Sequence, residues 1–510
     1  MSSPDIKTTL QTVDHLSAFP KGDKESDGFR VVFEQTPVEL LATPPSGTAY
    51  MQMWFSAPCG SDAGDGQGYY NGGRLHKDMR DGDKLRDNFA KMHASGYLSP
   101  DDTLNHLLYI PNHEGWGVVT QTSPNANEAT RPVAAFLPVL SEDGTKIQGV
   151  RHAIVDVNFQ DIQPGDWVVT NAALRCDAHW AINSATGFPD KCDRSTEGGH
   201  TRKRVPGHFE MPGDSNFAPD GLPYPNHMLT KVPDGLRKWI ENGDGDPEER
   251  IQALLFTEPL SCCFEAFAPI LMGMEKGEVD APKRIAILGD GPNAALLAFT
   301  AITVFPESTI YMLGRSDDKL YAIDAISPEN VRAINTSRND KKGSDLLREQ
   351  LSEEGALLDV IVPTFAAGNL NSYRDLLDPD NGRIVVWAAD LVGNNDLFKE
   401  VIPDDAERKG RVHHSYGGWN QAEWTALTVM DAVTRLFPNR LEALCRYPTQ
   451  IMGLQDAASA METWLDNSGR YEVKMNARQT SGKIVIDHRN GRGDIYRGAP
   501  LSSEVSAGSV

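Results

Sequence analysis

A glycine-rich turn between two apolar runs is the part of this sequence whose spacing indicates a chemistry most directly. The turn, Gly289-Asp290-Gly291-Pro292-Asn293-Ala294, fits the pattern G-x-G-x-x-G/A, follows a strand-like run and opens a helix-like run. In that setting the first glycine permits a tight turn, the second lets the backbone approach a pyrophosphate, and the alanine allows close helix packing. The N–H groups at the start of the helix would face the anion. We therefore predict a dinucleotide site on Gly289, Gly291, Pro292, Asn293 and Ala294.

The end of the next strand indicates which dinucleotide binds. NAD-specific units carry an acidic residue about 20 residues on, which binds the adenosine ribose. Here Gly314, Arg315 and Ser316 stand in that place, so the carboxylate is missing. The Arg315 guanidinium has the fixed charge and fork geometry that suit a 2′-phosphate, which favours NADP(H) over NAD(H), with Lys319 as a weaker contact. The alternative, in which Arg315 is a surface cation and Asp317 serves NAD(H), stays open.

Three short segments upstream carry residues that could bind a metal ion. They are APCGSD, PNHEGWG and TEPLSCC, which contain Cys59, His113, Glu114 and Glu258. A thiolate, an imidazole and carboxylates form a ligand set that suits Zn²⁺, and a catalytic zinc keeps one position open for water or substrate. Simpler interpretations also stand: Cys59 and His113 as core residues, and Glu258 as a carboxylate favoured beside a helix N-terminus.

Together with the glycine-rich turn that follows them in the chain, these segments resemble the zinc-dependent medium-chain dehydrogenase/reductase family of alcohol and polyol dehydrogenases. The resemblance runs from about residue 29 to residue 487. It implies an α/β fold, with a doubly wound parallel-sheet (Rossmann) cofactor domain and a β-rich GroES-like catalytic domain. It also implies one catalytic zinc held by Cys59, His113 and Glu258, with Glu114 as an exchanging or outer ligand. Ser61 matches the hydroxyl that passes the substrate proton toward solvent.

The sequence departs from the family pattern in two places. The histidine that often follows the relay serine is absent, and His76, His93 and His106 are replacements that the spacing does not separate. The region that often holds a structural zinc with four cysteines has only Cys176, His179 and Cys192. Four-ligand closed sites are usual for structural zinc. We therefore expect this region to be metal-free.

The elements that must position these residues divide the chain into two domains. Strand-like, turn and helix-like runs alternate after residue 258, and their apolar β-branched strands are typical of a parallel sheet covered on both faces. We predict a Rossmann domain at 258–420 inserted in a catalytic domain made of 1–257 and 421–510. An N-terminal arm and insertions near 64–110, 120–162 and 193–225 account for the extra length, and the insertions would shape a substrate pocket or an oligomer interface.

Composition limits the partners and the compartment. The 510 residues carry a net charge of −22, which disfavours nucleic acid and anionic membranes as partners. Six scattered cysteines do not suit a disulfide framework. The apolar stretch 294–305 is shorter than the roughly 18 to 20 residues that a spanning helix needs. We expect a cytoplasmic protein with no membrane or nucleic-acid partner.

Together these features predict an oxidoreductase that moves a hydride between NADP(H) and a secondary alcohol or ketone. The substrate would be a polar small molecule such as a polyol, a cyclitol or a sugar-like compound. The resemblance implies a homodimer or homotetramer. Two alternatives remain: the same fold acting on an unusual substrate of specialised metabolism, and a non-catalytic NADP-binding protein. The retained Cys59, His113 and Glu258 favour catalysis, because a chain released from catalysis would have no chemical reason to keep them.

Overall fold

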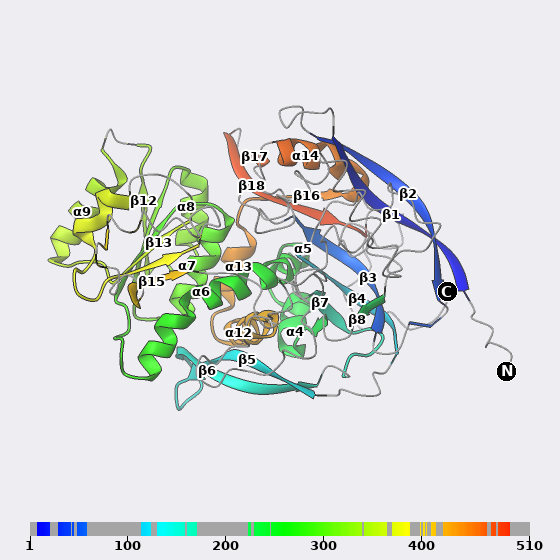
Figure 1. The fold of residues 1–510 in the computed structure, drawn as a ribbon, viewed down its shortest axis with the longest axis horizontal. Helices are drawn as coiled ribbons and strands as arrows, with labels where there is room; N and C mark the ends of the chain where they lie inside the picture. The colour runs from blue at the N-terminus through cyan, green and yellow to red at the C-terminus, as the bar shows by residue number, and fades with distance from the viewer. Residues whose placement is uncertain are drawn as a thin grey trace.

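A computed structural model shows two large sheets side by side, each with its own helices (Figure 1). One sheet has six strands and the other has eight. The structure describes residues 8–20, 29–41, 43–44, 48–58, 114–123, 130–158, 161–170, 223–225, 229–244, 246–338, 341–364, 370–387, 398, 401–402, 404, 410–414, 422–466, 471–475 and 478–489.

The six-stranded sheet is parallel throughout and carries the glycine-rich turn. Its strands are β10 (Arg284–Leu288), β11 (Thr309–Gly314), β12 (Val331–Asn335), β13 (Val360–Pro363), β14 (Arg383–Val386) and β15 (Val412–His414). Their order is β12-β11-β10-β13-β14-β15. Numbered from β10, this is the 3-2-1-4-5-6 order of the Rossmann fold. The predicted doubly wound parallel sheet is therefore confirmed.

Both faces of this sheet are covered, which explains its continuous apolar strands. In β10, Ile285 and Ile287 pack into one apolar cluster, while Ala286 and Leu288 pack into another. The surrounding helices are α7 (Pro292–Val304), α8 (Asp317–Asp324), α9 (Gly343–Glu354) and the 3₁₀ helix η7 (Leu370–Leu376). Because successive strand residues face opposite sides, burial on both faces requires apolar residues at every position.

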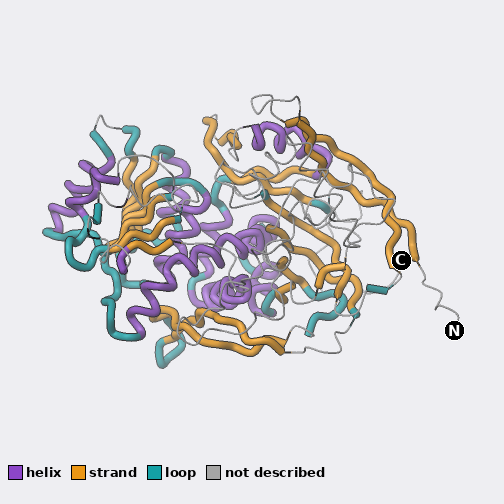
Figure 2. The backbone as a smooth tube through the Cα atoms, in the orientation of Figure 1, coloured by secondary structure: helices purple, strands orange, loops and turns teal. Residues whose placement is uncertain are grey.

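A long apolar helix, α6 (Thr257–Glu275), packs against α7 and α12 (Ala422–Leu436) at the centre of the molecule (Figure 2). The helical run Pro247–Glu275 is long and apolar enough to cross a membrane by length and composition, but 83% of its apolar window is buried inside the protein. That burial is the property of a core helix. The apolar stretch at 294–305 lies almost entirely in the shorter helix α7.

The eight-stranded sheet combines strands from the first half of the chain with strands from its C-terminal part. Its order is β16-β18-β3-β4-β7-β9, with β17 on β18 and β8 on β3. Strands β3 (Thr48–Ala57), β4 (Glu114–Thr122), β7 (Trp167–Thr170), β8 (Pro223–Pro225) and β9 (Leu229–Lys231) come from the first half. Strands β16 (Thr449–Gly453), β17 (Tyr471–Met475) and β18 (Arg478–Asp487) come from the C-terminal part.

Tryptophans fill the core between this sheet and its helices. The rings of Trp54, Trp116 and Trp167 lie with centroids 5.2 to 5.7 Å apart. Gly117 lets β3 and β4 approach closely, because a Cβ at this position would lie 2.1 Å from the Gln52 carbonyl oxygen. The GWG part of the PNHEGWG segment therefore has a packing role in addition to its place in the motif.

Two long hairpins and several short helices complete the fold. Strands β1 (Thr8–Pro20) and β2 (Phe29–Leu41) pair antiparallel, as do β5 (Thr130–Leu140) and β6 (Ile147–Asn158). The segment 120–162, interpreted as an insertion, thus contains a hairpin that packs on α12. The remaining helices are α4 (Asp234–Asn242), α5 (Pro247–Arg250), η6 (Ile251–Phe256), α13 (Pro438–Cys445) and α14 (Leu454–Asp466).

Candidate cofactor site and metal-ligand candidates

The glycine-rich turn connects β10 to α7 and has the backbone shape that the pattern predicts. Gly289 has φ +134°, a conformation that L side chains rarely adopt, and its N–H donates to the Leu313 carbonyl at 2.8 Å. A Cβ at Gly291 would meet nothing within 4 Å. Ala294, in the first turn of α7, is fully buried. The turn is therefore held on β11 and leaves open space above its second glycine.

The first turn of α7 suits an anion. Gly291 is the N-cap residue and Pro292 follows it, and no described side chain caps the helix. The first turn contains no acidic residue. Uncapped N–H groups at a helix start carry a partial positive charge, so the described residues fit a bound pyrophosphate. Asn293 is exposed beside them.

Asp290, the residue between the two glycines, connects this turn to the end of β11. Its Oδ2 accepts hydrogen bonds from the backbone N–H groups of Arg315 at 2.7 Å and Ser316 at 2.8 Å. A Cβ at Gly314 would lie 2.5 Å from the Asp290 Cβ and 2.7 Å from its Oδ2. The glycine at 314 thus makes room for the Asp290 side chain. The motif gives no sign of this role, because it accepts any residue at position 290.

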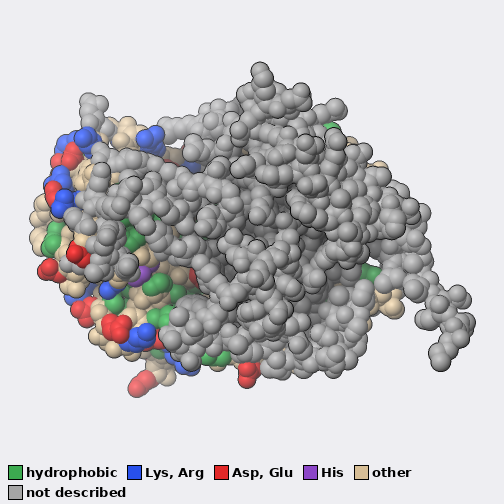
Figure 3. All heavy atoms as spheres, in the orientation of Figure 1, with side chains coloured by type: hydrophobic (Ala, Val, Ile, Leu, Met, Phe, Trp, Pro, Cys, Tyr) green, Lys and Arg blue, Asp and Glu red, His purple; other side chains and the backbone are tan. Residues whose placement is uncertain are grey.

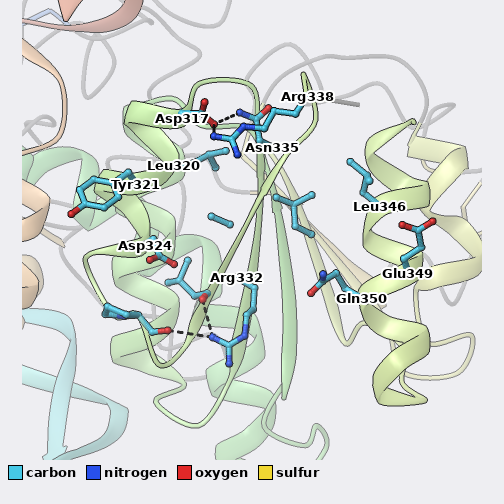
Figure 4. Close-up of a pocket in the computed structure, with 14 residues that line it drawn as sticks. Asp317, Leu320, Tyr321, Asp324, Arg332, Asn335, Arg338, Leu346, Glu349 and Gln350 are labelled. Carbon is cyan, nitrogen blue, oxygen red and sulfur yellow. Dashed lines mark hydrogen bonds and ion pairs between the residues drawn. The ribbon is translucent and has the colours of Figure 1, made fainter. Parts of the chain in front are cut away.

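Asp317, the alternative contact for the ribose, lies at the start of α8 and is bonded to neighbouring side chains. Its Oδ1 accepts hydrogen bonds from Asn335 Nδ2 at 2.5 Å and forms an ion pair with Arg338 at 2.8 Å (Figure 4). Ser337 Oγ donates to the Arg315 carbonyl at 3.0 Å, so the loop after β12 lies on the loop after β11. The Arg315 side chain is exposed, and it forms no ion pair with a described residue.

Lys319 is the second cation of this region and is 4% exposed. Burial lowers the pKa of Lys319, while the negative charge of Asp290 acts in the opposite direction. The Lys319 ammonium is thus close enough to interact electrostatically with the Asp290 carboxylate. Lys319 therefore brings positive charge to the Asp290 side of the site, and Arg315 brings it to the solvent side.

A cavity of about 720 Å³ lies beside the edge strand β12, between α8 and α9 (Figure 4). Asp317, Asn335 and Arg338 line one end of it, and Arg332 and Glu349 are among the residues that line the rest. None of the residues of the glycine-rich turn lines this cavity. It therefore adjoins the candidate cofactor site and is separate from the pyrophosphate turn. On the described part of the face in Figure 3, basic and acidic side chains are interspersed.

Tyr447, after helix α13, reaches the glycine-rich turn from the C-terminal part of the chain. Its hydroxyl donates to the Asp290 carbonyl at 2.6 Å, and the residue is 2% exposed. Burial raises the pKa of Tyr447 well above its ordinary value, so the hydroxyl keeps its proton and stays a donor. The turn is thus fixed from two sides, by Tyr447 at the Asp290 carbonyl and by the backbone just after β11 at the Asp290 carboxylate.

Of the predicted zinc ligands, the structure describes only the two glutamates. Cys59, His113 and the relay residue Ser61 lie outside the described residues. Glu114 starts β4, is 2% exposed and forms a buried ion pair with Lys483 of β18. Among described residues no group of three or more His, Cys, Asp or Glu is placed to hold a metal. The ligand set stays a prediction, and Glu114 has a structural partner that the sequence did not reveal.

Glu258 lies in the first turn of α6 and is 7% exposed. The Cys262 thiol donates to its Oε1 at 3.5 Å. Burial first, and then the nearby carboxylates of Glu258 and Glu265, raise the pKa of Cys262 well above its usual value. Burial likewise raises the pKa of Cys263. Both cysteines are therefore neutral thiols, and Cys262 is a hydrogen-bond donor to the Glu258 carboxyl group at this helix start.

The other sequence predictions fall largely on residues that the structure does not describe. These are the possible relay histidines His76, His93 and His106, the reduced metal region with Cys176, His179 and Cys192, and the insertions at 64–110 and 193–225. They stay predictions.

Comparison with known proteins supports the fold. No protein-family model and no curated protein matches the sequence. An alcohol dehydrogenase from Thermotoga maritima matches with a TM-score of 0.51 at 13% identity, and 2R,3R-butanediol dehydrogenase from Bacillus subtilis with 0.51 at 14%. A protein assigned as a zinc-binding dehydrogenase from Clostridium scindens matches with 0.50 at 16%. Each comparison covers 94% of this chain and 99% of the other.

Proposed function

We propose that this chain, which has the fold of the zinc-dependent medium-chain dehydrogenases, is an oxidoreductase for a secondary alcohol and its ketone. The observation that carries the proposal is the glycine-rich turn at the carboxyl end of β10, in a sheet of 3-2-1-4-5-6 order. Ligands of such sheets bind at the strand ends where the order reverses, which here is the boundary between β10 and β13. The turn also presents an uncapped helix start there.

NADP(H) is the proposed cofactor, with Gly289, Gly291, Pro292, Asn293 and Ala294 holding its pyrophosphate. Gly314, Arg315, Ser316 and Lys319 would hold its adenosine ribose and 2′-phosphate. The exposed Arg315 supports this choice, because its guanidinium is available to a phosphate while Asp317 is bonded to Asn335 and Arg338. When bound, the nicotinamide would supply the hydride donor or acceptor, and the protein would orient the substrate beside it.

A single zinc site with Cys59, His113 and Glu258, and with Glu114 as an outer or exchanging group, is proposed for the catalytic domain. Its support is the order of sequence motifs and the buried carboxylate of Glu258. When bound, zinc would act as a Lewis acid toward the substrate oxygen. Ser61 is the proposed carrier of the substrate proton. We also propose a cytoplasmic homodimer or homotetramer that takes a polar substrate such as a polyol, a cyclitol or a sugar-like compound.

A substrate screen tests the reaction class. Polyols, amino alcohols and their ketones are mixed with the protein and either NADP(H) or NAD(H), with and without a chelator, and nicotinamide absorbance is followed. We expect turnover that the chelator abolishes and that zinc restores. The metal content of the purified protein is measured in parallel, and Cys59→Ala should lose both zinc and activity. Cys445→Ala, a buried thiol outside the proposed site, is the matched control.

The outcomes separate the competing functions. Full activity in zinc-free protein and in Cys59→Ala would reject the zinc mechanism. Binding of NADPH without turnover of any substrate would instead favour the non-catalytic NADP-binding protein. Turnover restricted to a substrate outside the polar alcohols would keep the reaction class and reject the substrate class.

A further inference from the structure

A carboxylate stands at the adenosine-ribose end of the proposed cofactor site, although the second strand does not supply one. The position that ends β11 is Gly314, where NAD-binding sheets usually carry an acidic residue. The space of a side chain at Gly314 is occupied by Asp290, whose Cβ, Cγ and Oδ2 lie 2.5 to 2.9 Å from where a Cβ would stand. The acidic group thus reaches the same place from the glycine-rich turn.

The carboxylate is fixed on one side only. Oδ2 takes the N–H groups of Arg315 and Ser316, which hold the side chain against the end of β11. Oδ1 accepts no hydrogen bond from a described residue, and the side chain is half-buried. A half-buried carboxylate oxygen has acceptor capacity left for a hydroxyl donor.

We propose that Asp290 binds the adenosine ribose hydroxyls and thereby lets the site accept NAD(H) as well as NADP(H). This inference rests on the proposed dinucleotide function. With NAD(H), the 2′- and 3′-hydroxyls can donate to Oδ1. With NADP(H), the same negative charge opposes the 2′-phosphate, while Arg315 and Lys319 attract it. Asp290 therefore limits the preference for NADP(H) that Arg315 creates.

Asp317 does not compete for this role. Its Oδ1 is shared between Asn335 and Arg338, and these contacts hold the loop after β12 in place. The buried Lys319 lies near Asp290. Its positive charge offsets the repulsion between the Asp290 carboxylate and a bound 2′-phosphate. The ribose end thus combines one acidic acceptor with two cations, an arrangement suited to both cofactors.

The test is Asp290→Asn, with dissociation constants for NADH and NADPH measured by nicotinamide fluorescence in the full-length protein. The amide oxygen can keep the two bonds from Arg315 and Ser316, while the charge and the Oδ1 acceptor are removed. We expect affinity for NADH to fall about tenfold, as for a lost hydrogen bond to a charged group, and affinity for NADPH to stay or rise. The ratio of the dissociation constant for NADH to that for NADPH should increase about tenfold or more.

Asp318→Asn is the control, because it removes the same charge from the first turn of α8, where no described residue bonds to it. Gly314→Ala is a second variant, since its methyl group would displace Asp290, and it should also weaken NADH binding. An unchanged ratio in Asp290→Asn, or an equal change in Asp318→Asn, overturns the inference and leaves the proposed function standing. Wild-type protein that binds neither cofactor overturns both.

Discussion

The hydroxyl of Tyr447 donates a 2.6 Å hydrogen bond to the carbonyl of Asp290, which lies 157 residues earlier in the chain. Tyr447 follows α13, and β16 begins two residues later in the eight-stranded sheet. Asp290 belongs to the glycine-rich turn of the six-stranded sheet. The bond therefore joins the segment that leads into the eight-stranded sheet to the turn proposed to bind the pyrophosphate.

Tyr447→Phe should loosen this connection without changing the packing. The ring keeps its volume, and the Asp290 carbonyl loses a buried donor, so we expect the free energy of unfolding to fall by about 1 kcal/mol. Affinity for NADPH should weaken with it, because the turn loses one of its two anchors. Urea unfolding and fluorescence titration measure the two effects. Tyr321→Phe, at a tyrosine that is 77% exposed, should change neither. Unaltered stability in Tyr447→Phe would show that the bond is not formed in solution.

Arg315→Ala should weaken NADPH binding much more than NADH binding. The guanidinium is exposed at the end of β11 and would contact only the 2′-phosphate, which NADH lacks. A charge-assisted contact of this kind is worth about 1.5 to 3 kcal/mol, or roughly 10- to 150-fold in the NADPH dissociation constant. Arg338→Ala, which removes the cation bonded to Asp317, is the matched comparison. Equal losses for both cofactors in Arg315→Ala would reject the assignment.

The sequence was sufficient to predict the doubly wound parallel sheet because the signals for it are local. The turn at Gly289 and Gly291 follows its strand directly, and apolar β-branched strands separated by helices specify a parallel sheet. The strand order and the helix start at Pro292 agree with that interpretation. The resemblance to medium-chain dehydrogenases correctly indicated the fold.

The contacts that distinguish this site could not be predicted, because they join residues far apart in the chain. Asp290 occupies a position at which the motif accepts any residue, and its partners, Arg315 and Ser316, are 25 and 26 residues away. Glu114 and Lys483 are separated by 369 residues and meet only because β18 returns to the sheet of β3 and β4. No periodicity or spacing reports such pairs.

His488 should make the stability of the protein sensitive to acid. It is buried, with Nε2 2.8 Å from Ser56 Oγ, and burial lowers the pKa of His488 to about 3. The His488 imidazole then stays neutral in the folded chain, whereas in the unfolded chain it takes up a proton near pH 6.5. The contribution of the neutral His488 to the free energy of unfolding is complete above that pH. It is lost as the pH falls from about 6.5 toward 3, by up to about 1.4 kcal/mol per pH unit.

His488→Gln should remove this dependence. Urea unfolding at pH 7.5, 6 and 5 would give the free energies of both proteins. We expect the advantage of the wild type to be constant above about pH 7 and to shrink at lower pH with the slope above. An advantage that is the same at all three pH values would contradict the burial of a neutral imidazole.

The buried ion pair of Glu114 on β4 and Lys483 on β18 should contribute strongly to the stability of the eight-stranded sheet. Their side chains are 2% and 9% exposed, so removal of either partner takes a close counter-ion away from a charge in the protein interior. We expect Lys483→Met and Glu114→Gln each to lower the free energy of unfolding by about 3 to 5 kcal/mol, and the double variant to recover part of the loss. Lys341→Met breaks the exposed pair with Glu349 and should cost less than about 1 kcal/mol.

Zinc content separates the structural role of Glu114 from its predicted role at the metal. If Glu114 acts only through the ion pair, Glu114→Gln and Lys483→Met lose stability to a similar extent, and both keep their zinc when folded. If Glu114 also exchanges onto the metal, Glu114→Gln alone loses zinc affinity, because Lys483→Met leaves the carboxylate intact. Metal analysis after dialysis at a pH and temperature where both variants are folded measures the difference. Equal losses of zinc in both would instead show that the pair positions the site as a unit.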